Sequence, residues 1–342
     1  MKNQKIVNLR ALAILIVMFG HSIIIYSTNW NYYSSTVTCV FLDRLKKIID
    51  CIQMPLYFSI SGFLFYYSQK NIVAHTTVCH GHVSFFGGNK YFTFVISKFK
   101  RLIVPFVVFS LCWMLPIKLA VKYPPYNNNS IINIIFKKIL WGEDNGYLWY
   151  LETLFFIFIL MYPVCKGLYN NKNCSKWYCI VFISLLVIMF SSRYLKEIPI
   201  LYNVSNYCFW FYLGFLINRL NNFSECAYIK FLPIICLVMI IIMLYTENVN
   251  RLIQFIIGLT FVFWIYNVIP DNHNIVIDMI AENSFGLYLF HSALVFITFA
   301  YIRNMSPFAV IIINFILLGV VSYLLTISIK KSKLKIIIGE YL

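Results

Sequence analysis

The sequence has few charged residues for its length. Of its 342 residues, 12% are Asp, Glu, Lys or Arg, whereas 61% are hydrophobic and 19% are aromatic. Soluble domains average about 25% charged residues. The composition therefore excludes an ordinary soluble domain and indicates a polytopic membrane protein.

Several familiar sequence signatures are also missing. The ten cysteines show no paired spacing and mostly lie in or beside apolar runs, which excludes a disulfide framework. There is no GxxxxGK[ST] phosphate loop and no GxSxG nucleophile elbow. No cleavable signal is recognisable, so we expect the first apolar run to stay in place as a signal-anchor.

Apolar runs long enough to span a membrane dominate what remains. They predict an all-α polytopic membrane protein, a bundle of about ten transmembrane helices forming one domain over residues 1–342. With the N-terminus inside, 17 of the 28 Lys and Arg residues lie on the inner side, which predicts N-in and C-in. The predicted spans are 10–28, 48–68, 102–121, 148–167, 177–192, 206–220, 231–245, 252–270, 284–302 and 307–329.

The net charge of +16 is compatible with nucleic-acid binding in principle. The basic residues, however, lie at the ends of apolar runs and not in one patch. We interpret them as topology determinants and as contacts for anionic membrane lipids or an anionic cosubstrate, and we predict no nucleic-acid partner.

Arg10 and His21 are the most informative residues, because everything between them is apolar or Gly. Eleven residues make almost three helical turns, so both side chains project from one face, roughly 16 Å apart along the axis. This spacing predicts a cation at a membrane boundary and an imidazole near the middle of the bilayer. An ionisable group at that depth is a candidate functional site, and the alternative is a packing His bonded to a neighbouring helix.

A second intramembrane histidine occurs in the run that starts at Asn283. Ser284, Tyr288 and His291 fall on one helical stripe, and Asn283 or Ser284 is expected to cap the helix. The alternative is a structural His bonded through Tyr288.

Basic residues open the third predicted span. Lys98 and Arg101 lie three residues apart at the predicted inner boundary, where together with Arg10 they can bind phosphates. The alternative is ordinary positive-inside charge.

Polar residues also begin the second and fourth spans. Glu152 can orient an imidazole, as carboxylates do in acyl-transfer triads, or it can simply reach water at the boundary. Asp50 and Trp149 are the predicted substrate-binding residues. Pro55 and two serines in the second span indicate either a kinked helix lining a cavity or a close helix–helix contact.

One loop contains residue types that bind metals. The spacing of these residues matches no zinc signature, so no metal is expected. The set comprises His75, Cys79, His80 and His82.

Taken together, the motifs resemble the membrane acyltransferase-3 family, the integral-membrane O-acyltransferases of bacterial surface polysaccharides. The resemblance covers nearly the whole chain. It rests on Arg10-x10-His21, Met54 to Phe63, Lys98-x-x-Arg101 with Pro105, Leu148 to Leu151, and Ser284 to His291.

The resemblance implies an acyl-CoA donor, usually acetyl-CoA, and a sugar hydroxyl on a glycan or lipid-linked saccharide as acceptor. It implies that His21 is the catalytic imidazole, as a general base or as an acyl carrier, and that Arg10 and Arg101 bind the donor. We expect Ser284, Tyr288 and His291 to line the same pore as Arg10 and His21. In that pore, Tyr288 and His291 either contact the pantetheine arm or orient the catalytic imidazole. Two departures from the family pattern are Lys98, where Arg is commoner, and Tyr147, where His often precedes Leu-Trp.

The predicted function is therefore O-acylation at the bacterial inner membrane. One alternative is a transporter or flippase of lipid-linked sugars, which would show internal repeats and charges spread over many helices. Another is a glycan polymerase with a large outer loop, and the donor can also be succinyl-CoA or another acyl-CoA.

Overall fold

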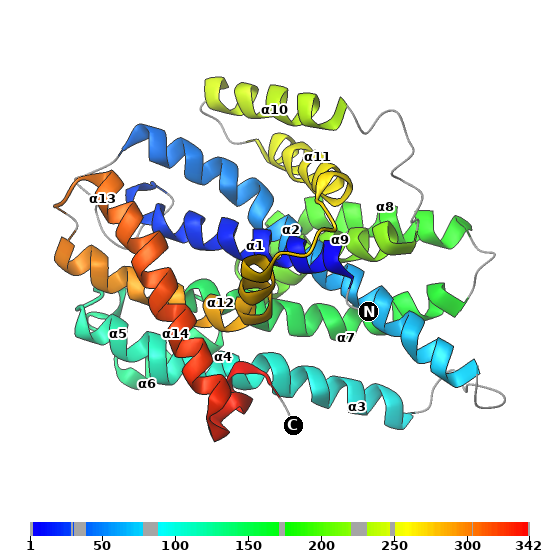
Figure 1. Cartoon of the computed structure of the whole chain (residues 1–342), viewed down its shortest axis with the longest axis horizontal. Coiled ribbons are helices and arrows are strands. Elements are labelled where there is room, and N and C mark those ends of the chain that lie inside the picture. Colours follow the sequence, from blue (N-terminus) through cyan, green and yellow to red (C-terminus); the bar gives the residue numbers. More distant parts are fainter. Residues whose placement is uncertain are drawn as a thin grey trace. The chain divides into compact units, whose positions relative to one another are not determined.

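The structure is a computed structural model that describes residues 3–28, 30, 39–77, 88–170, 175–219, 231–246, 250–302 and 304–340. For residues 69–77, 88–90, 169, 170, 175 and 246 it describes the backbone alone. This described part of the chain is helical and contains no strand (Figure 1).

Nine of the described helices are long and apolar enough to cross a membrane. A further apolar helix, Leu232–Tyr245, is shorter. These helices confirm the prediction of an all-α polytopic membrane protein. The sides on which the two termini lie, and the single domain over 1–342, stay predictions.

The chain divides into two compact units. Unit 1 contains Met1–Tyr57, Val107–Phe136 and Ser224–Leu342. Unit 2 contains Phe58–Phe106 and Lys137–Phe223. Helix α2 (Val40–Thr77), helix α4 (Val104–Phe109) and the π-helix η5 (Ile134–Leu140) each begin in one unit and end in the other.

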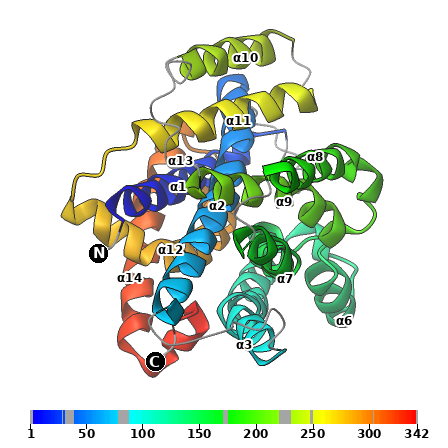
Figure 2. The same cartoon turned by 90° about the vertical axis from the view of Figure 1, so that its right-hand side faces the viewer.

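Unit 1 is organised around α12 (Ile275–Ile302), which packs against α1 (Gln4–Ser22) and α14 (Leu318–Lys331). Helices α10 (Leu232–Thr246) and α11 (Arg251–Val268) lie side by side (Figures 1 and 2). The remaining elements of this unit are η1 (Ile24–Tyr26), η3 (Ser110–Met114), α5 (Leu115–Ala120), η4 (Pro124–Tyr126), α6 (Ile131–Asn133), α13 (Pro307–Ile312), η10 (Ile313–Leu317) and η11 (Lys333–Ile338).

Polar side chains hold the first half of α1 in place. The amide of Asn8 donates to the carbonyl oxygens of Pro270 (2.9 Å) and Asn272 (3.1 Å), and that of Gln4 donates to Asp278 (2.6 Å). These bonds tie α1 to the segment before α12 and to the first turn of α12. They also fix the rotation of α1, so that its next polar residue, Arg10, faces α12.

Unit 2 is built on α7 (Trp149–Asn170), α8 (Ser175–Ser191) and α9 (Pro199–Arg219), with α9 packed against both others (Figure 2). Helix α3 (Gly88–Lys98) and the π-helix η2 (Phe99–Ile103) pack along α7. The short elements of this unit are η6 (Gly146–Leu148) and η7 (Ser192–Leu195).

Two glycines allow α2 and α9 to touch through their backbones. A Cβ atom at Gly62 would overlap the carbonyl of Phe211, and one at Gly214 would overlap the carbonyl of Ser59. The amide of Asn218 donates to the carbonyl of Phe63 at 2.9 Å in the same contact. Pro55 and the two serines of α2 indicated either a kinked helix lining a cavity or a close helix–helix contact. The backbone contacts at Gly62 and Gly214 support the second interpretation.

Several predicted helix ends were wrong. Helix α12 begins at Ile275, nine residues before the predicted start, and Asn274 accepts hydrogen bonds from the amides of Val276 and Ile277. Asn283 and Ser284 are therefore not caps: they lie inside the helix and donate to the carbonyls of Met279 and Ala281.

Candidate active site

Arg10 and Ser284 meet at the contact between α1 and α12. The Arg10 guanidinium donates from Nη2 to the Ser284 hydroxyl (3.1 Å) and to the carbonyl oxygen of Ala281 (3.0 Å). Arg10 lies in the second turn of α1, not at its first residue as the predicted span had implied. The predicted cation is thus inside a membrane-spanning helix and is held by polar atoms of α12.

His21 and His291 form the second contact between these helices. The Nδ1 atom of His21 lies 2.7 Å from Nε2 of His291, and the two rings are nearly parallel, with centroids 5.0 Å apart. His291 is buried, whereas His21 is half-buried and so remains accessible. The structure therefore brings the two predicted intramembrane histidines into direct contact.

The hydrogen bonds assign the tautomers of both rings in their neutral forms. Nδ1 of His291 lies 2.7 Å from the carbonyl oxygen of Leu287, which can only accept, so this nitrogen carries the proton. Nε2 of His291 must then accept, and Nδ1 of His21 is the donor. The lone pair of His21 is left on Nε2, where it can take a proton or attack an electrophile.

His21 lies in the last turn of α1, since this helix ends at Ser22 and not at residue 28. The predicted end of this span at residue 28 was therefore wrong, and the depth of the imidazole in the bilayer stays a prediction. The predicted common face of Arg10 and His21 agrees with the contacts of both side chains with α12. Tyr288 is buried beside this contact, with its ring centroid 6.3 Å from that of His291.

Helix α2 contributes a second polar group to unit 1. This group lies inside the helix, because α2 begins at Val40, eight residues before the predicted start at residue 48. Asp50 accepts hydrogen bonds from Lys46 and from the Gln53 amide (2.6 Å), and its side chain keeps 31% of its surface exposed. The Gln53 side-chain oxygen is buried without a hydrogen-bond partner among the described residues. It points at Gly20, the residue before His21, so this polar group adjoins the histidine pair.

Two lysines of this unit, expected only as topology charges, have buried side chains. Lys46 is 4% exposed, and its spacing of four residues from Asp50 was a usable signal. Lys118 is fully buried, with its ammonium 4.4 Å from the ring of Tyr123 and 5.0 Å from that of Tyr126. Local sequence gives no sign of this aromatic enclosure, because Phe296 of α12 supplies a third ring.

The basic pair of Lys98 and Arg101 belongs to unit 2. It was predicted to lie at the start of a helix, and this was wrong, because α3 already begins at Gly88. The Lys98 ammonium lies over the rings of Phe158 (4.2 Å) and Phe94 (5.3 Å), whereas the Arg101 side chain is exposed. The π-helix Phe99–Ile103 begins between them, and such distortions often occur at functional sites.

Trp149 and Glu152 also belong to unit 2. The Trp149 ring contacts Tyr207 (5.2 Å between centroids) and Phe58 (6.3 Å). Glu152 is buried and accepts a hydrogen bond from the Asn145 amide at 2.9 Å. The structure shows His291 as a partner of His21, while a role for Glu152 in orienting an imidazole stays a prediction.

No group of three His, Cys, Asp or Glu residues suited to a metal ion occurs in the part of the chain with described side chains. The loop set of His75, Cys79, His80 and His82 lies outside that part.

Comparisons with known proteins agree with the motif pattern. The model of the acyltransferase-3 family, described as an acyltransferase domain, matches residues 3–330. No curated protein and no solved structure matches the chain significantly. The family match includes Arg10, His21, Lys98, Arg101 and His291, and it extends over both units.

Proposed function

The chain belongs to the acyltransferase-3 family, and from this we propose that it is a membrane-bound O-acyltransferase that uses acyl-CoA, with acetyl-CoA as the expected donor. The proposed acceptor is a hydroxyl group of a cell-surface glycan or its lipid-linked precursor, at the bacterial inner membrane. The observation that carries the proposal is the contact between His21 and His291 inside a membrane-spanning unit.

His21 is the proposed catalytic base. Its Nε2 takes the proton of the acceptor hydroxyl while the oxygen attacks the thioester carbonyl. The carbon–sulfur bond then breaks, and the CoA thiolate leaves with the proton that His21 has held. In the alternative acyl-relay mechanism, Nε2 attacks the thioester carbonyl itself and the CoA thiolate leaves. The acyl group then passes from Nε2 to the acceptor oxygen, and the hydroxyl proton goes to the thiolate.

His291 acts on this step through His21. By accepting from Nδ1 of His21, it holds the ring in the tautomer whose Nε2 is unprotonated. A fixed ring orientation reduces the freedom that must be lost on reaching the transition state. The bond from His291 to the Leu287 carbonyl fixes His291 in turn.

Donor binding is proposed for the basic residues. Arg10 lies on the helix that carries His21, and Ser284 and Tyr288 lie on the helix that carries His291, which suits the path of a pantetheine arm. Arg101 is exposed, so its guanidinium is accessible to a CoA phosphate. Asp50, with 31% of its side chain exposed, is the proposed acceptor contact in unit 1.

Mass spectrometry of surface glycans, with and without the gene, tests the activity. We expect one sugar to lose the mass of an acyl group in the deletion strain and to regain it with the native gene. His21→Ala should lower acylation by about two orders of magnitude or more, the scale of losing a general base. The matched control is His273→Ala, because His273 is 68% exposed and should tolerate the change.

Near-normal acylation in a well-expressed His21→Ala strain would refute the catalytic assignment. Unchanged glycans in the deletion strain, together with lipid-linked sugars trapped on one side of the membrane, would favour the transporter. Incubation of the purified protein with labelled acyl-CoA alone distinguishes the two mechanisms, because only the relay leaves label on His21.

A further inference from the structure

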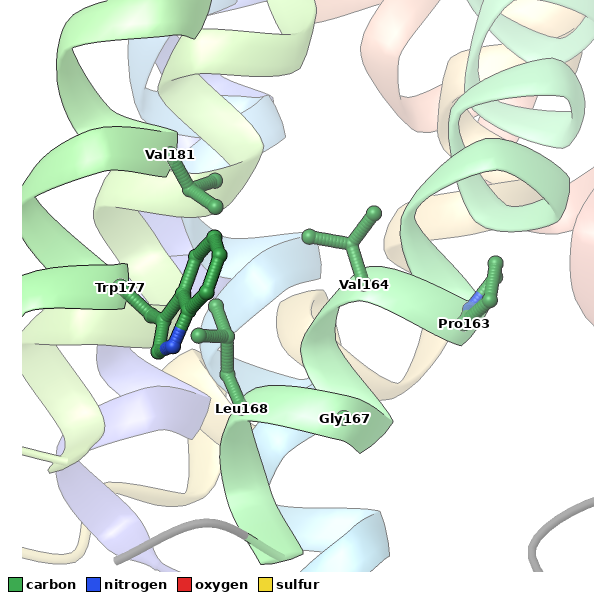
Figure 3. A pocket seen from close by; sticks show the side chains of 6 residues that line it. All are labelled: Pro163, Val164, Gly167, Leu168, Trp177 and Val181. Carbon is green, nitrogen blue, oxygen red and sulfur yellow. The ribbon is translucent and has the colours of Figure 1, made fainter. Parts of the chain in front are cut away.

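Unit 2 contains an apolar groove between α7 and α8 that none of the proposed chemistry uses (Figure 3). Its volume is about 250 Å³. Gly167 leaves space on α7, and Trp177 of α8 forms the opposite wall with 55% of its surface exposed. The other lining residues are Pro163, Val164, Leu168 and Val181.

The groove is formed by two helices that are each long and apolar enough to span a membrane. Such a surface faces hydrocarbon, so an acyl chain is the natural occupant of its apolar lining. The groove lies near the end of α7 and the start of α8, where an interfacial tryptophan is also typical. By the predicted topology this is the cytoplasmic leaflet.

A cation adjoins the groove. Arg219, the last residue of α9, donates to the carbonyl oxygen of Leu168 at 3.4 Å and stacks on the Tyr178 ring at 3.9 Å. Tyr178 donates to the same carbonyl. Arg219 forms no ion pair with a carboxylate of the described residues.

These contacts use one of the five N–H donors of Arg219 and one face of its guanidinium. The remaining donors suit a phosphate diester, which accepts bidentate bonds. Lys166 and Lys176 add positive charge at the same end of the unit. The combination of an acyl-chain groove and an adjacent guanidinium favours a lipid whose headgroup carries net negative charge.

We propose that this groove is a binding site for one anionic phospholipid, with an acyl chain between α7 and α8 and the phosphate at Arg219. The proposal is independent of the acyltransferase chemistry. It predicts selectivity for phosphatidylglycerol over phosphatidylcholine, whose headgroup cation would oppose Arg219.

Fluorescence quenching tests the site in the full chain reconstituted into bilayers. Acyl-chain-brominated phosphatidylglycerol or phosphatidylcholine is added at increasing mole fraction, and the signal of Trp177 is obtained by subtracting the Trp177→Phe variant. We expect half-quenching at about fivefold less phosphatidylglycerol than phosphatidylcholine, the preference that one cation near a membrane surface gives. High salt should reduce this preference.

Three variants make the test specific. Arg219→Gln should abolish the preference, while Arg219→Lys should retain it and controls for folding. Gly167→Leu should fill the groove and reduce quenching by both lipids. The matched control is Arg193→Gln, because Arg193 stacks on Tyr194 at the other end of α8 and should leave the preference intact. Equal quenching by the two lipids, or loss of the preference in Arg193→Gln, would overturn the proposal.

Discussion

Replacing His291 by Phe tests how the candidate site works. The ring is kept at a similar size, but the acceptor 2.7 Å from Nδ1 of His21 is removed. His21 becomes positively charged when its Nε2 takes the proton, and a hydrogen bond from a charged donor contributes about 1.5–3 kcal/mol. Since about 1.4 kcal/mol corresponds to a tenfold change in rate, kcat should fall by about 10- to 150-fold, with a smaller change in the KM for acyl-CoA.

The assay is the initial rate of acyl transfer by the purified protein in bilayers, with acyl-CoA varied at saturating acceptor. His291→Gln should recover part of the rate, because its side-chain oxygen can accept from His21. Asn314→Leu is the structural control: it removes a bond from Thr298 (2.6 Å) and one to the Ser22 carbonyl (3.3 Å). Asn314→Leu should lower the melting temperature of the purified protein and leave kcat close to that of the native protein.

The double variant gives the decisive comparison. If His291 acts only through His21, then His21→Ala with His291→Phe should be no slower than His21→Ala alone. If His291→Phe slows the His21→Ala variant by the same factor as it slows the native protein, the positioning role is refuted. A raised KM with unchanged kcat in His291→Phe would instead assign this residue to the donor.

Further predictions concern the donor, the topology and the helix contact in unit 2. Arg101→Ala should raise the KM for acyl-CoA by about 10- to 150-fold, the loss of a charge-assisted contact, and an unchanged KM would contradict donor binding. Reporter fusions at Asn128 and at the C-terminus should report opposite sides of the membrane, and same-side signals would mean a miscounted span. Gly214→Ala should cost about 1–3 kcal/mol or more, because its Cβ overlaps the Ser59 backbone, and should lower the melting temperature of the purified protein. The methyl group of Gly167→Ala projects into the groove, so this variant should keep the native melting temperature. Equal effects of Gly167→Ala and Gly214→Ala on the melting temperature would argue against the contact between Gly214 and Ser59.

The sequence was most informative where helical geometry decides the outcome. The eleven-residue spacing of Arg10 and His21 predicted one shared face, and both side chains do contact α12. The stripe of Ser284 and His291 predicted the matching face of the second helix. The helical periodicity alone was sufficient to predict these contact faces, because a buried polar residue in an apolar helix must face a partner.

Helix ends were less predictable, because hydropathy detects the apolar middle of a span and not its polar turns. Asp278 and Glu282 lower the hydropathy at the start of α12, so the predicted span began only at residue 284. In the structure Asp278 lies in the first turn of α12 and accepts a hydrogen bond from Gln4. Tertiary packing, more than propensity, stabilises such turns.

The residues that surround a buried charge were also not predictable from the neighbouring sequence. Lys118 is enclosed by rings from residues 5, 8 and 178 positions further along the chain, at Tyr123, Tyr126 and Phe296. A single sequence gives no indication of the last of these. The long-range contact of His21 with His291 became predictable only because both residues stood out as ionisable groups within apolar runs.

The glycine contact in unit 2 has a consequence for biosynthesis. Gly62 and Gly214 are about 150 residues apart, and chains grow at about 5–20 residues per second, so α2 precedes its partner by roughly 8–30 s. During that interval its small-residue face has no α9 to cover it, and such faces associate readily with other helices in a membrane. Insertion factors or neighbouring helices must therefore shield this face, and a chain truncated before Pro199 would leave it permanently open to aggregation.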